Sequence, residues 1–227
     1  MKIVLKKKPK GATLIEGFPG FGLVGTIVTE FLIDHLKCEK IGEFIYDDLP
    51  ATVAIHKGEL IYPMSVFYNK KYNVLILHTI LDVKGFEWEV ADVVAKMCTD
   101  LEVKETISLE GVTGSIEGDK IYSFQNKKFE KLGAENVSES VVMGVTAAML
   151  VRQKNISCLF AETKSTMPDS RAAAKTMALL GTYLGIDLDT APLLAQAELF
   201  EGKIKGIMEQ ANSTAKESQA KQMSYFG

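Results

Sequence analysis

The sequence has few cysteines and histidines, no long hydrophobic run and no excess of one charge. Its 227 residues include three cysteines, none of which belongs to a C-x-x-C pair: Cys38, Cys98 and Cys158. We therefore expect reduced thiols and a cytoplasmic location rather than a disulfide framework. No stretch approaches the roughly 20 apolar residues that span a bilayer, and the first residues lack the apolar run of a signal peptide. These absences predict a protein that has no membrane partner.

The charges nearly balance, since 26 lysines and arginines accompany 29 aspartates and glutamates. A nucleic-acid-binding protein normally carries a basic excess or stripe, so no nucleic-acid partner is expected. We interpret the basic cluster at residues 6–10 as a solvated strand end. The three histidines, His35, His56 and His78, lack metal-ligand spacing, and His78 is predicted to be a hydrogen-bonded core residue. No metal site and no cofactor are predicted.

Segments typical of strands alternate with segments typical of helices along most of the chain. The run VLILHTIL, residues 74–81, is typical of a central strand that is buried on both faces. This alternation predicts an α/β fold, a three-layer α/β/α sandwich with a mostly parallel sheet. Residues 52–69 are interpreted as a hairpin-like excursion and residues 111–114 as a turn. The other expected strands cover residues 2–8, 12–16, 41–46, 105–109, 120–124 and 156–161, and the expected helices cover residues 22–36, 86–101, 138–152 and 169–184.

The helix expected over residues 138–152 contains the run VVMGVTAAMLV and is apolar nearly all round. Such a helix is either buried in the core or covered by a partner subunit. Both interpretations stay open at the level of the sequence.

The end of the chain has a different pattern, which we treat as a separate unit. Apolar residues spaced by three or four predict an amphipathic helix: Leu193, Ala197, Phe200, Ile204 and Ile207. A polar stretch, residues 210–222, separates this helix from the hydrophobic tip Tyr225, Phe226 and Gly227. We therefore expect an α/β/α core domain over residues 1–192, and a C-terminal helix with a flexible docking tail over residues 193–227. An aromatic tip on a polar tether suits insertion into a pocket of another protein; the alternative is a frayed terminus.

The stretch EGFPGFGLVG, residues 16–25, contains the pattern G-x-G-x-x-G. A dinucleotide-binding loop joins its strand directly to the first glycine and presents a helix N-terminus to the diphosphate. Here Phe18 and Pro19 come between strand and glycine, and Phe18 and Phe21 crowd the turn. We therefore interpret the loop as a packed turn between a strand and a helix.

Four acidic residues follow or end predicted strands: Glu16, Asp82, Glu110 and Glu162. Ligand sites gather at the carboxyl ends of parallel strands, so these residues define a possible pocket. Two carboxylates held close together there could differ in pKa and act as acid and base. The alternative is that they cap helices or meet solvent. No G-x-S-x-G motif accompanies them.

Residues 16–25 resemble the signature of the proteasome assembly chaperone family, in its archaeal branch. The motif is carried by Gly17, Phe18, Pro19, Gly20, Gly22 and Gly25, and a later segment of the family is matched by Ala161-Glu162-Thr163 and Pro168-Asp169. The resemblance implies an α/β/α sandwich related to nucleoside phosphorylases and hydrolases, without established catalysis. It also implies homo-oligomers that engage the α subunits of the core proteasome.

The resemblance also gives the C-terminal tip a role. Family members can end in hydrophobic–Tyr–X, which inserts between proteasome α subunits and pairs its carboxylate with a lysine. In this chain Tyr225 would take the hydrophobic place and Phe226 the place of the tyrosine, so the penultimate hydroxyl is lost.

We therefore predict a non-enzymatic, homo-oligomeric proteasome assembly chaperone or activator-like protein that binds the α ring through Tyr225, Phe226 and Gly227. The alternative is a small-molecule-binding protein, or a hydrolase- or phosphorylase-like enzyme that uses the acidic residues at the strand ends.

Overall fold

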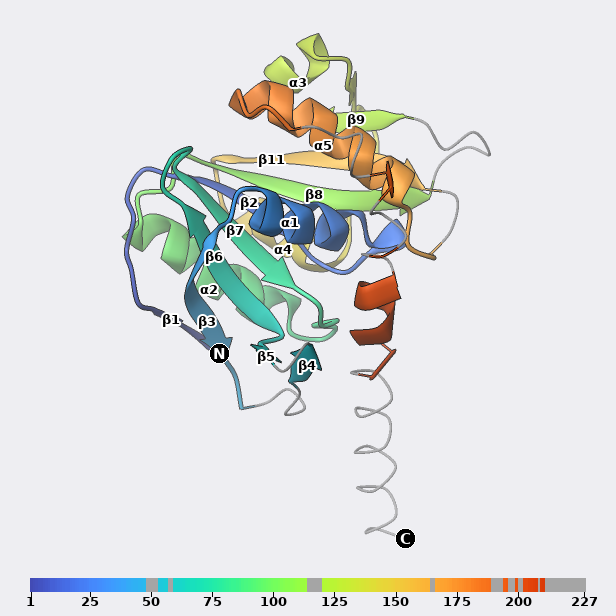
Figure 1. Ribbon diagram of the computed structural model, residues 1–227. Helices are drawn as coiled ribbons and strands as arrows, with labels where there is room; N and C mark the ends of the chain where they lie inside the picture. Colours follow the sequence, from blue (N-terminus) through green and yellow to red (C-terminus); the bar gives the residue numbers. More distant parts are fainter. Residues whose placement is uncertain are drawn as a thin grey trace, which may run out of the picture.

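The computed structural model describes residues 1–47, 53–56, 59–113, 120–163, 166–188, 194–195, 199, 202–207 and 209–210. A nine-stranded sheet organises this part of the chain, with the order β1-β3-β6-β7-β2-β8-β11-β9-β10 (Figure 1). Its strands are β1 Lys2–Leu5, β2 Thr13–Gly17, β3 Glu39–Ile45, β6 Met64–Asn69, β7 Val74–Thr79, β8 Glu105–Thr113, β9 Ile121–Phe124, β10 Glu135–Asn136 and β11 Ile156–Thr163. A separate antiparallel pair is formed by β4 Ala54–His56 and β5 Glu59–Ile61.

Parallel pairing is concentrated at the centre of the sheet. There β2 pairs in parallel with β7 and β8, and β8 pairs in parallel with β11. On one flank β6, β3 and β1 continue in antiparallel pairs; on the other, β9 is antiparallel to β11, and the short β10 is parallel to β9. The expectation of a mostly parallel sheet is therefore wrong for the flanks. The reason is connection length, because β6 and β7 are joined by a short turn without a crossover helix.

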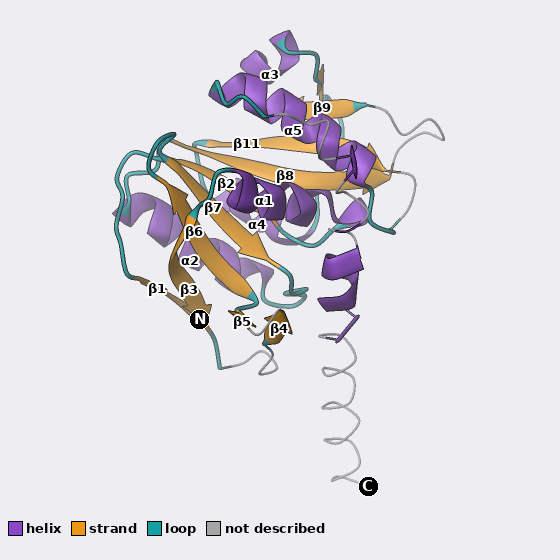
Figure 2. Cartoon of the chain, viewed as in Figure 1, coloured by secondary structure: helices purple, strands orange, loops and turns teal. Residues whose placement is uncertain are grey.

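Helices pack on both faces of the sheet (Figure 2). Together with the strands they form two apolar clusters. The helices are η1 Phe21–Leu23, α1 Val24–His35, α2 Glu87–Asp100, α3 Lys127–Lys131, α4 Gly144–Arg152 and α5 Ser170–Leu184. On one face, α1, α3 and α5 pack with Ile15 and Ile76, and on the other α2 and α4 pack with Leu14 and Leu75. Neighbouring residues of β2 and β7 thus alternate between the clusters. Every residue of β7 is buried, which confirms the interpretation of this run as a central strand.

Both ends of α5 fall where the sequence predicts them. The Asp169 carboxylate accepts a hydrogen bond from the backbone N–H of Ala172 at 3.0 Å, which caps the start of the helix. The helix ends at Leu184, and Gly185 then adopts a left-handed conformation with a φ of 66°.

Two expectations that involve glycines are wrong. The helix predicted from residue 138 begins at Gly144, because Met143 is extended and Gly144 has a φ of 74°, which interrupts any helical run. The turn predicted over residues 111–114 is replaced by strand as far as Thr113, since Gly111 pairs with Ala161 of β11. A side chain on Gly111 would lie 1.9 Å from the Phe21 carbonyl oxygen, so this glycine permits close packing of η1 on β8.

The described part of the C-terminal segment packs on the core. Residues 202–207 are helical, Ile207 is buried, and Ile204 belongs to the same apolar cluster as α1 and α5. The expected stripe residues Leu193, Ala197 and Phe200, and the tip Tyr225, Phe226 and Gly227, lie outside the described residues. The boundary at residue 192 stays a prediction. In the ranges that the structure describes, no helix combines the length and apolarity needed to cross a bilayer.

Candidate functional site

The carboxyl ends of β2 and β8 bring two acidic side chains to one face of the sheet. Glu16 is the register partner of Ser108, and Glu110 lies two residues further along β8. Helix α4 covers this place, where the hydroxyls of Ser108 and Thr146 lie 3.0 Å apart. A small cavity of about 70 Å³ opens beside Glu110, and its other lining residues include Asp82, Thr146, Phe18 and Pro19. Three of the four acids predicted for a pocket therefore lie in one region.

Burial governs the protonation of this acid pair. Glu16 is fully buried, and neither of its carboxylate oxygens has a hydrogen-bond partner. Burial raises its pKa to about 8, the negative charge of Glu110 adds to the rise, and the Ser108 hydroxyl opposes it. Burial also raises the pKa of Glu110 to about 7, against the Thr146 hydroxyl. At neutral pH Glu16 is therefore held mainly in the neutral form, a state suited to donating a proton or a hydrogen bond.

Cys158, which interacts electrostatically with both acids, is not a nucleophile. Cys158 is fully buried on β11, and burial together with the charges of Glu16 and Glu110 raises the pKa of its thiol. A thiol held protonated in this way is chemically inert at neutral pH. Within the ranges that the structure describes, no group of three or more histidine, cysteine or acidic side chains is placed to hold a metal ion.

Glu162, the fourth acid, has a structural environment of its own. The Tyr122 hydroxyl donates to Glu162 at 2.8 Å, and the backbone N–H of Lys120 donates to its other oxygen at 3.4 Å. These bonds join β11 to β9 and to Lys120, the residue that precedes β9. The carboxylate of Asp82 meanwhile accepts a hydrogen bond from the backbone N–H of Lys84 at 3.0 Å, which closes a tight turn at the cavity.

The glycines of the loop at residues 16–25 serve close backbone packing. A side chain on Gly17 would lie 2.2 Å from the Gly25 carbonyl oxygen, and one on Gly25 would lie 2.4 Å from the Leu109 carbonyl oxygen. Since neither position has room for a Cβ, the start of α1 lies directly against the ends of β2 and β8. Phe18 and Pro19 line the small cavity, whereas Gly20 lies beside Glu110. This geometry supports the interpretation of the loop as a packed turn.

The same loop contacts the second motif segment, far along the chain. Gly22 has a φ of 62°, and a side chain there would lie 2.6 Å from the Thr163 side chain. The Gly22 carbonyl oxygen also accepts a hydrogen bond from the Asp169 N–H at 2.9 Å. The two segments that carry the family resemblance therefore form one contact, which the sequence pattern did not reveal.

A second polar cluster lies on the opposite face of the sheet. Glu30 of α1 lies 3.1 Å from Nε2 of His78 on β7, and its other oxygen pairs with Nζ of Lys203. Nδ1 of His78 lies 2.9 Å from the Thr29 hydroxyl. Burial alone would raise the pKa of Glu30, but hydrogen bonds and charges from His78 and Lys203 outweigh it and lower the pKa to about 2. His78 is thus a hydrogen-bonded core histidine, as predicted.

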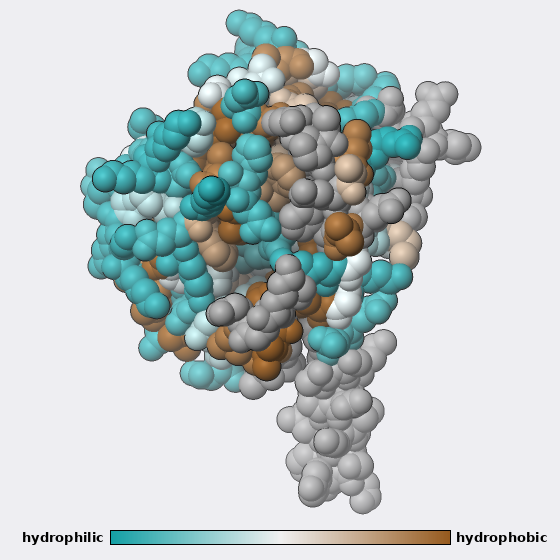
Figure 3. Space-filling model, viewed as in Figure 1, coloured by the Kyte–Doolittle hydropathy of each residue, from teal (hydrophilic) through white to brown (hydrophobic). Residues whose placement is uncertain are grey.

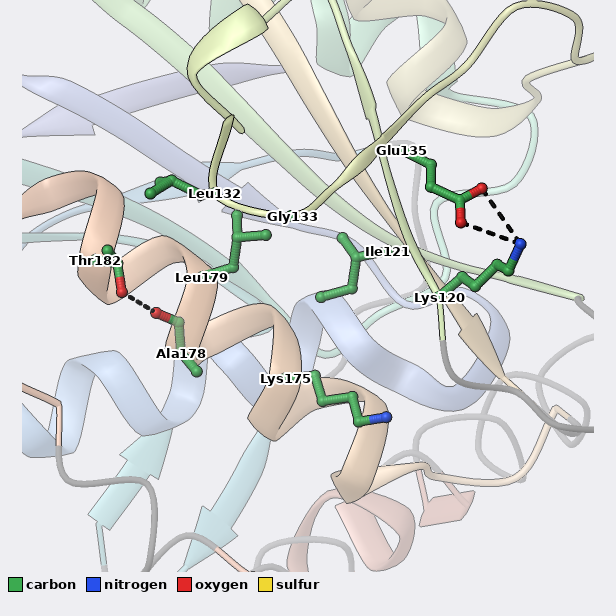
Figure 4. Close-up of a pocket in the computed structure, with 9 residues that line it drawn as sticks. All are labelled: Lys120, Ile121, Leu132, Gly133, Glu135, Lys175, Ala178, Leu179 and Thr182. Carbon is green, nitrogen blue, oxygen red and sulfur yellow. Dashed lines mark hydrogen bonds and ion pairs between the residues drawn. The ribbon is translucent and has the colours of Figure 1, made fainter. Parts of the chain in front are cut away.

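A more open cleft lies between α5 and the edge of the sheet at β9 (Figure 4). Its volume is about 510 Å³, and it holds none of the predicted site residues. Lys120 on its wall is paired with Glu135 at 3.0 Å, and the Thr182 hydroxyl donates to the Ala178 carbonyl of its own helix at 2.9 Å. These polar groups are satisfied within the chain, so we place the candidate site at the strand ends.

The fold and the packed glycine turn define a mixed α/β protein with a large sheet. The profile of the PAC2 family matches residues 14–208, and the chain belongs to this family. One relative in sequence is the uncharacterized protein MJ0106 of Methanocaldococcus jannaschii, which is 27% identical to this chain over 223 residues, covering 92% of each chain.

Solved structures agree with this assignment. The crystal structure of Pyrococcus furiosus PbaA, described as an archaeal homolog of proteasome-assembly chaperone, superposes with a TM-score of 0.82 at 26% identity, covering 93% of this chain and 99% of that one. Pyrococcus furiosus PbaB, described as an archaeal proteasome activator, shares the fold with a TM-score of 0.72 at 19% identity, covering 91% of this chain and 98% of that one. The family resemblance seen in the sequence is therefore confirmed.

Proposed function

We propose that this protein acts on the core proteasome as a non-enzymatic assembly chaperone or activator-like partner in the cytoplasm. The observation that carries the proposal is the match to PbaA along nearly the whole chain, within the PAC2 family.

Docking is proposed to occur on the α ring through Tyr225, Phe226 and Gly227. The support is the order of three parts at the end of the chain: a helical segment packed on the core, a polar stretch and an aromatic tip. Residues 202–207 are fixed to the core by Ile204 and Lys203. The sequence of residues 210–222 is polar, and two adjacent aromatic residues, Tyr225 and Phe226, then supply anchor side chains.

The experiment compares binding of purified α-subunit rings to the intact chain, to Phe226→Ala and to the matched control Ser224→Ala. We expect Phe226→Ala to weaken binding by about tenfold or more, as loss of a buried aromatic anchor does. The control should bind as the intact chain does. Equal binding by all three removes the docking tip, and absence of binding by the intact chain removes the proteasome function.

We also propose that copies of this chain associate through the β4–β5 pair. Ile55 and Leu60 are cross-strand neighbours and are 72% and 49% exposed. Hydrophobic side chains gather on the surface in this region (Figure 3). A two-stranded pair outside the main sheet is marginal alone, so a second copy covering its apolar face would stabilise it.

The measurement for this contact is the mass in solution, by light scattering, of Ile55→Glu. The control is Val151→Glu, which changes an equally apolar side chain of α4 that is 67% exposed. We expect the first variant to lower the mass and the second to leave it unchanged. The opposite result assigns the subunit contact to α4, which the sequence left open.

The second candidate function is a small-molecule binder or enzyme at the strand ends. The observation that favours it is the buried pair Glu16 and Glu110, because both carboxyl oxygens of Glu16 and one of Glu110 are left to donate to or accept from a ligand. Thermal-shift screening against nucleotides, nucleosides and phosphate tests it, because a ligand of the native state raises the melting temperature. No shift for any compound counts against this candidate.

A further inference from the structure

The C-terminal helical segment, residues 202–207, is fastened to the core by apolar and ionic contacts. Ile204 and Ile207 are 1% and 8% exposed, so they hold the segment against the core by burial. Lys203 extends to Glu30 of α1, where the side chains are only 23% and 14% exposed. Lys205, in the same segment, is more exposed, and its Nζ lies 3.9 Å from a carboxylate oxygen of Glu209, four residues further along the chain.

The two kinds of contact have different consequences. Apolar burial is non-directional, so two isoleucines alone would allow the segment to roll or slide on α1 and α5. A partly buried ion pair requires one geometry, and such pairs can specify register at little gain in stability. Glu30 is also restrained from behind, because its other oxygen lies 3.1 Å from His78. The acceptor for Lys203 therefore has a fixed position set by the central strand β7.

We propose that the Glu30–Lys203 pair is a latch that fixes the direction in which the chain leaves the core toward residue 211, and thereby positions the docking tail. This inference rests on the proposed docking to the α ring. A fixed starting point would favour binding, because the tail would sample fewer orientations and lose less conformational entropy when its tip binds the α ring. Glu30 and Lys203 are positioning residues, and neither needs to touch the partner.

The first measurement is hydrogen exchange of residues 202–207 in the full chain, without any partner. Lys203→Met keeps the length of the side chain and removes its charge, and we expect it to raise exchange in this segment by about tenfold. Glu30→Gln should have the same effect, and the double variant should add little to either. Lys203→Arg keeps the charge and should restore protection. Lys205→Met is the matched control and should exchange as the native chain does. Equal exchange in Lys203→Met and in the native chain overturns the latch.

The second measurement is binding of each variant to α-subunit rings. We expect Lys203→Met to weaken binding by about three- to tenfold, with recovery in Lys203→Arg and no change in Lys205→Met. Should Lys203→Met loosen the segment while binding stays at the native level, the positioning role is wrong and the proposed function stands. Should the native chain fail to bind, the proposed function and the positioning role fall, whereas exchange still decides whether the latch exists.

Discussion

Two buried glutamate sites on opposite faces of the same sheet have opposite electrostatics. Glu16 has no hydrogen-bond partner for either oxygen, and its pKa is raised to about 8. Glu30 lies between His78 and Lys203, and its pKa is lowered to about 2. Burial raises the pKa in both cases, so the difference comes from the partners. At neutral pH, Glu16 is therefore mainly protonated and neutral, whereas Glu30 is ionised.

The largest effect is expected from the pH dependence that Glu16 imposes. Between its ordinary pKa of 4.5 and its folded value of about 8, the folded chain keeps a proton that the unfolded chain has released. Stability therefore falls as pH rises through this window, by about 4 kcal/mol from this group. Glu16→Gln should be nearly neutral at pH 4.5 and stabilising at pH 8, measured by urea unfolding. A parallel pH profile in variant and native chain would contradict the assignment.

Removing the Glu30 carboxylate, on the opposite face of the sheet, should have the next largest effect on stability. Glu30→Ala leaves His78 and Lys203 without their shared carboxylate in a largely buried place. We expect a loss of about 3 kcal/mol at pH 7. The native chain should itself lose this contribution as pH falls from 4.5 toward 2, because the pKa of Glu30 is lowered. Thermal unfolding of the native chain and of Glu30→Ala at pH 7 and pH 3 measures this loss. The difference in stability between the two chains should be smaller at pH 3.

An effect of similar size is expected from Glu110, whose pKa is raised from 4.5 to about 7 and which lines the small cavity. Glu110→Gln removes the charge that adds to the raised pKa of Glu16. We expect about 3 kcal/mol of stabilisation at pH 8, and a lower pKa for Glu16. Titration of Glu16 followed by NMR distinguishes the two contributions, and an unchanged Glu16 titration would show that the pair is not coupled.

The smallest effect is expected where an ion pair has no burial. Lys96 and Asp100 lie 3.0 Å apart on α2, with side chains 76% and 58% exposed. Lys96→Met should change stability by less than about 0.5 kcal/mol, and added salt should remove even that. Urea unfolding at low and high salt checks it. A loss comparable to that of Glu30→Ala would mean that burial does not account for the difference between the sites.

The sequence predicts well those features that depend on local pattern. The central strand within residues 74–81 and both ends of the helix predicted over residues 169–184 follow from periodicity and from the conformations that these residues favour. The antiparallel flanks were missed because strand direction depends on connections as well as on composition. The extension of β8 past Gly111 was missed because glycine serves close packing there, whereas the pattern suggested a turn.

The candidate sites also include residues whose proximity the local pattern predicts and residues whose proximity it does not. Glu16 and Glu110 could be paired from their positions at strand ends, since parallel neighbours place such residues together. Glu162 shares that pattern but is bonded to Tyr122 across an antiparallel pair that the sequence did not indicate. The contact between Glu30 and Lys203 joins residues far apart along the chain, and no local spacing can show it.

The contact between Gly22 and Asp169 has a consequence for how this protein folds. Asp169 donates its N–H to the glycine loop and caps α5 with its carboxylate, so one residue joins the entry of α1 to the entry of α5. The Gly22 carbonyl oxygen therefore has this partner only when the start of α5 is in place. We therefore expect α1, α5 and the loop between β2 and α1 to form and open as a single cooperative unit, although Gly22 and Asp169 are 147 positions apart in the sequence.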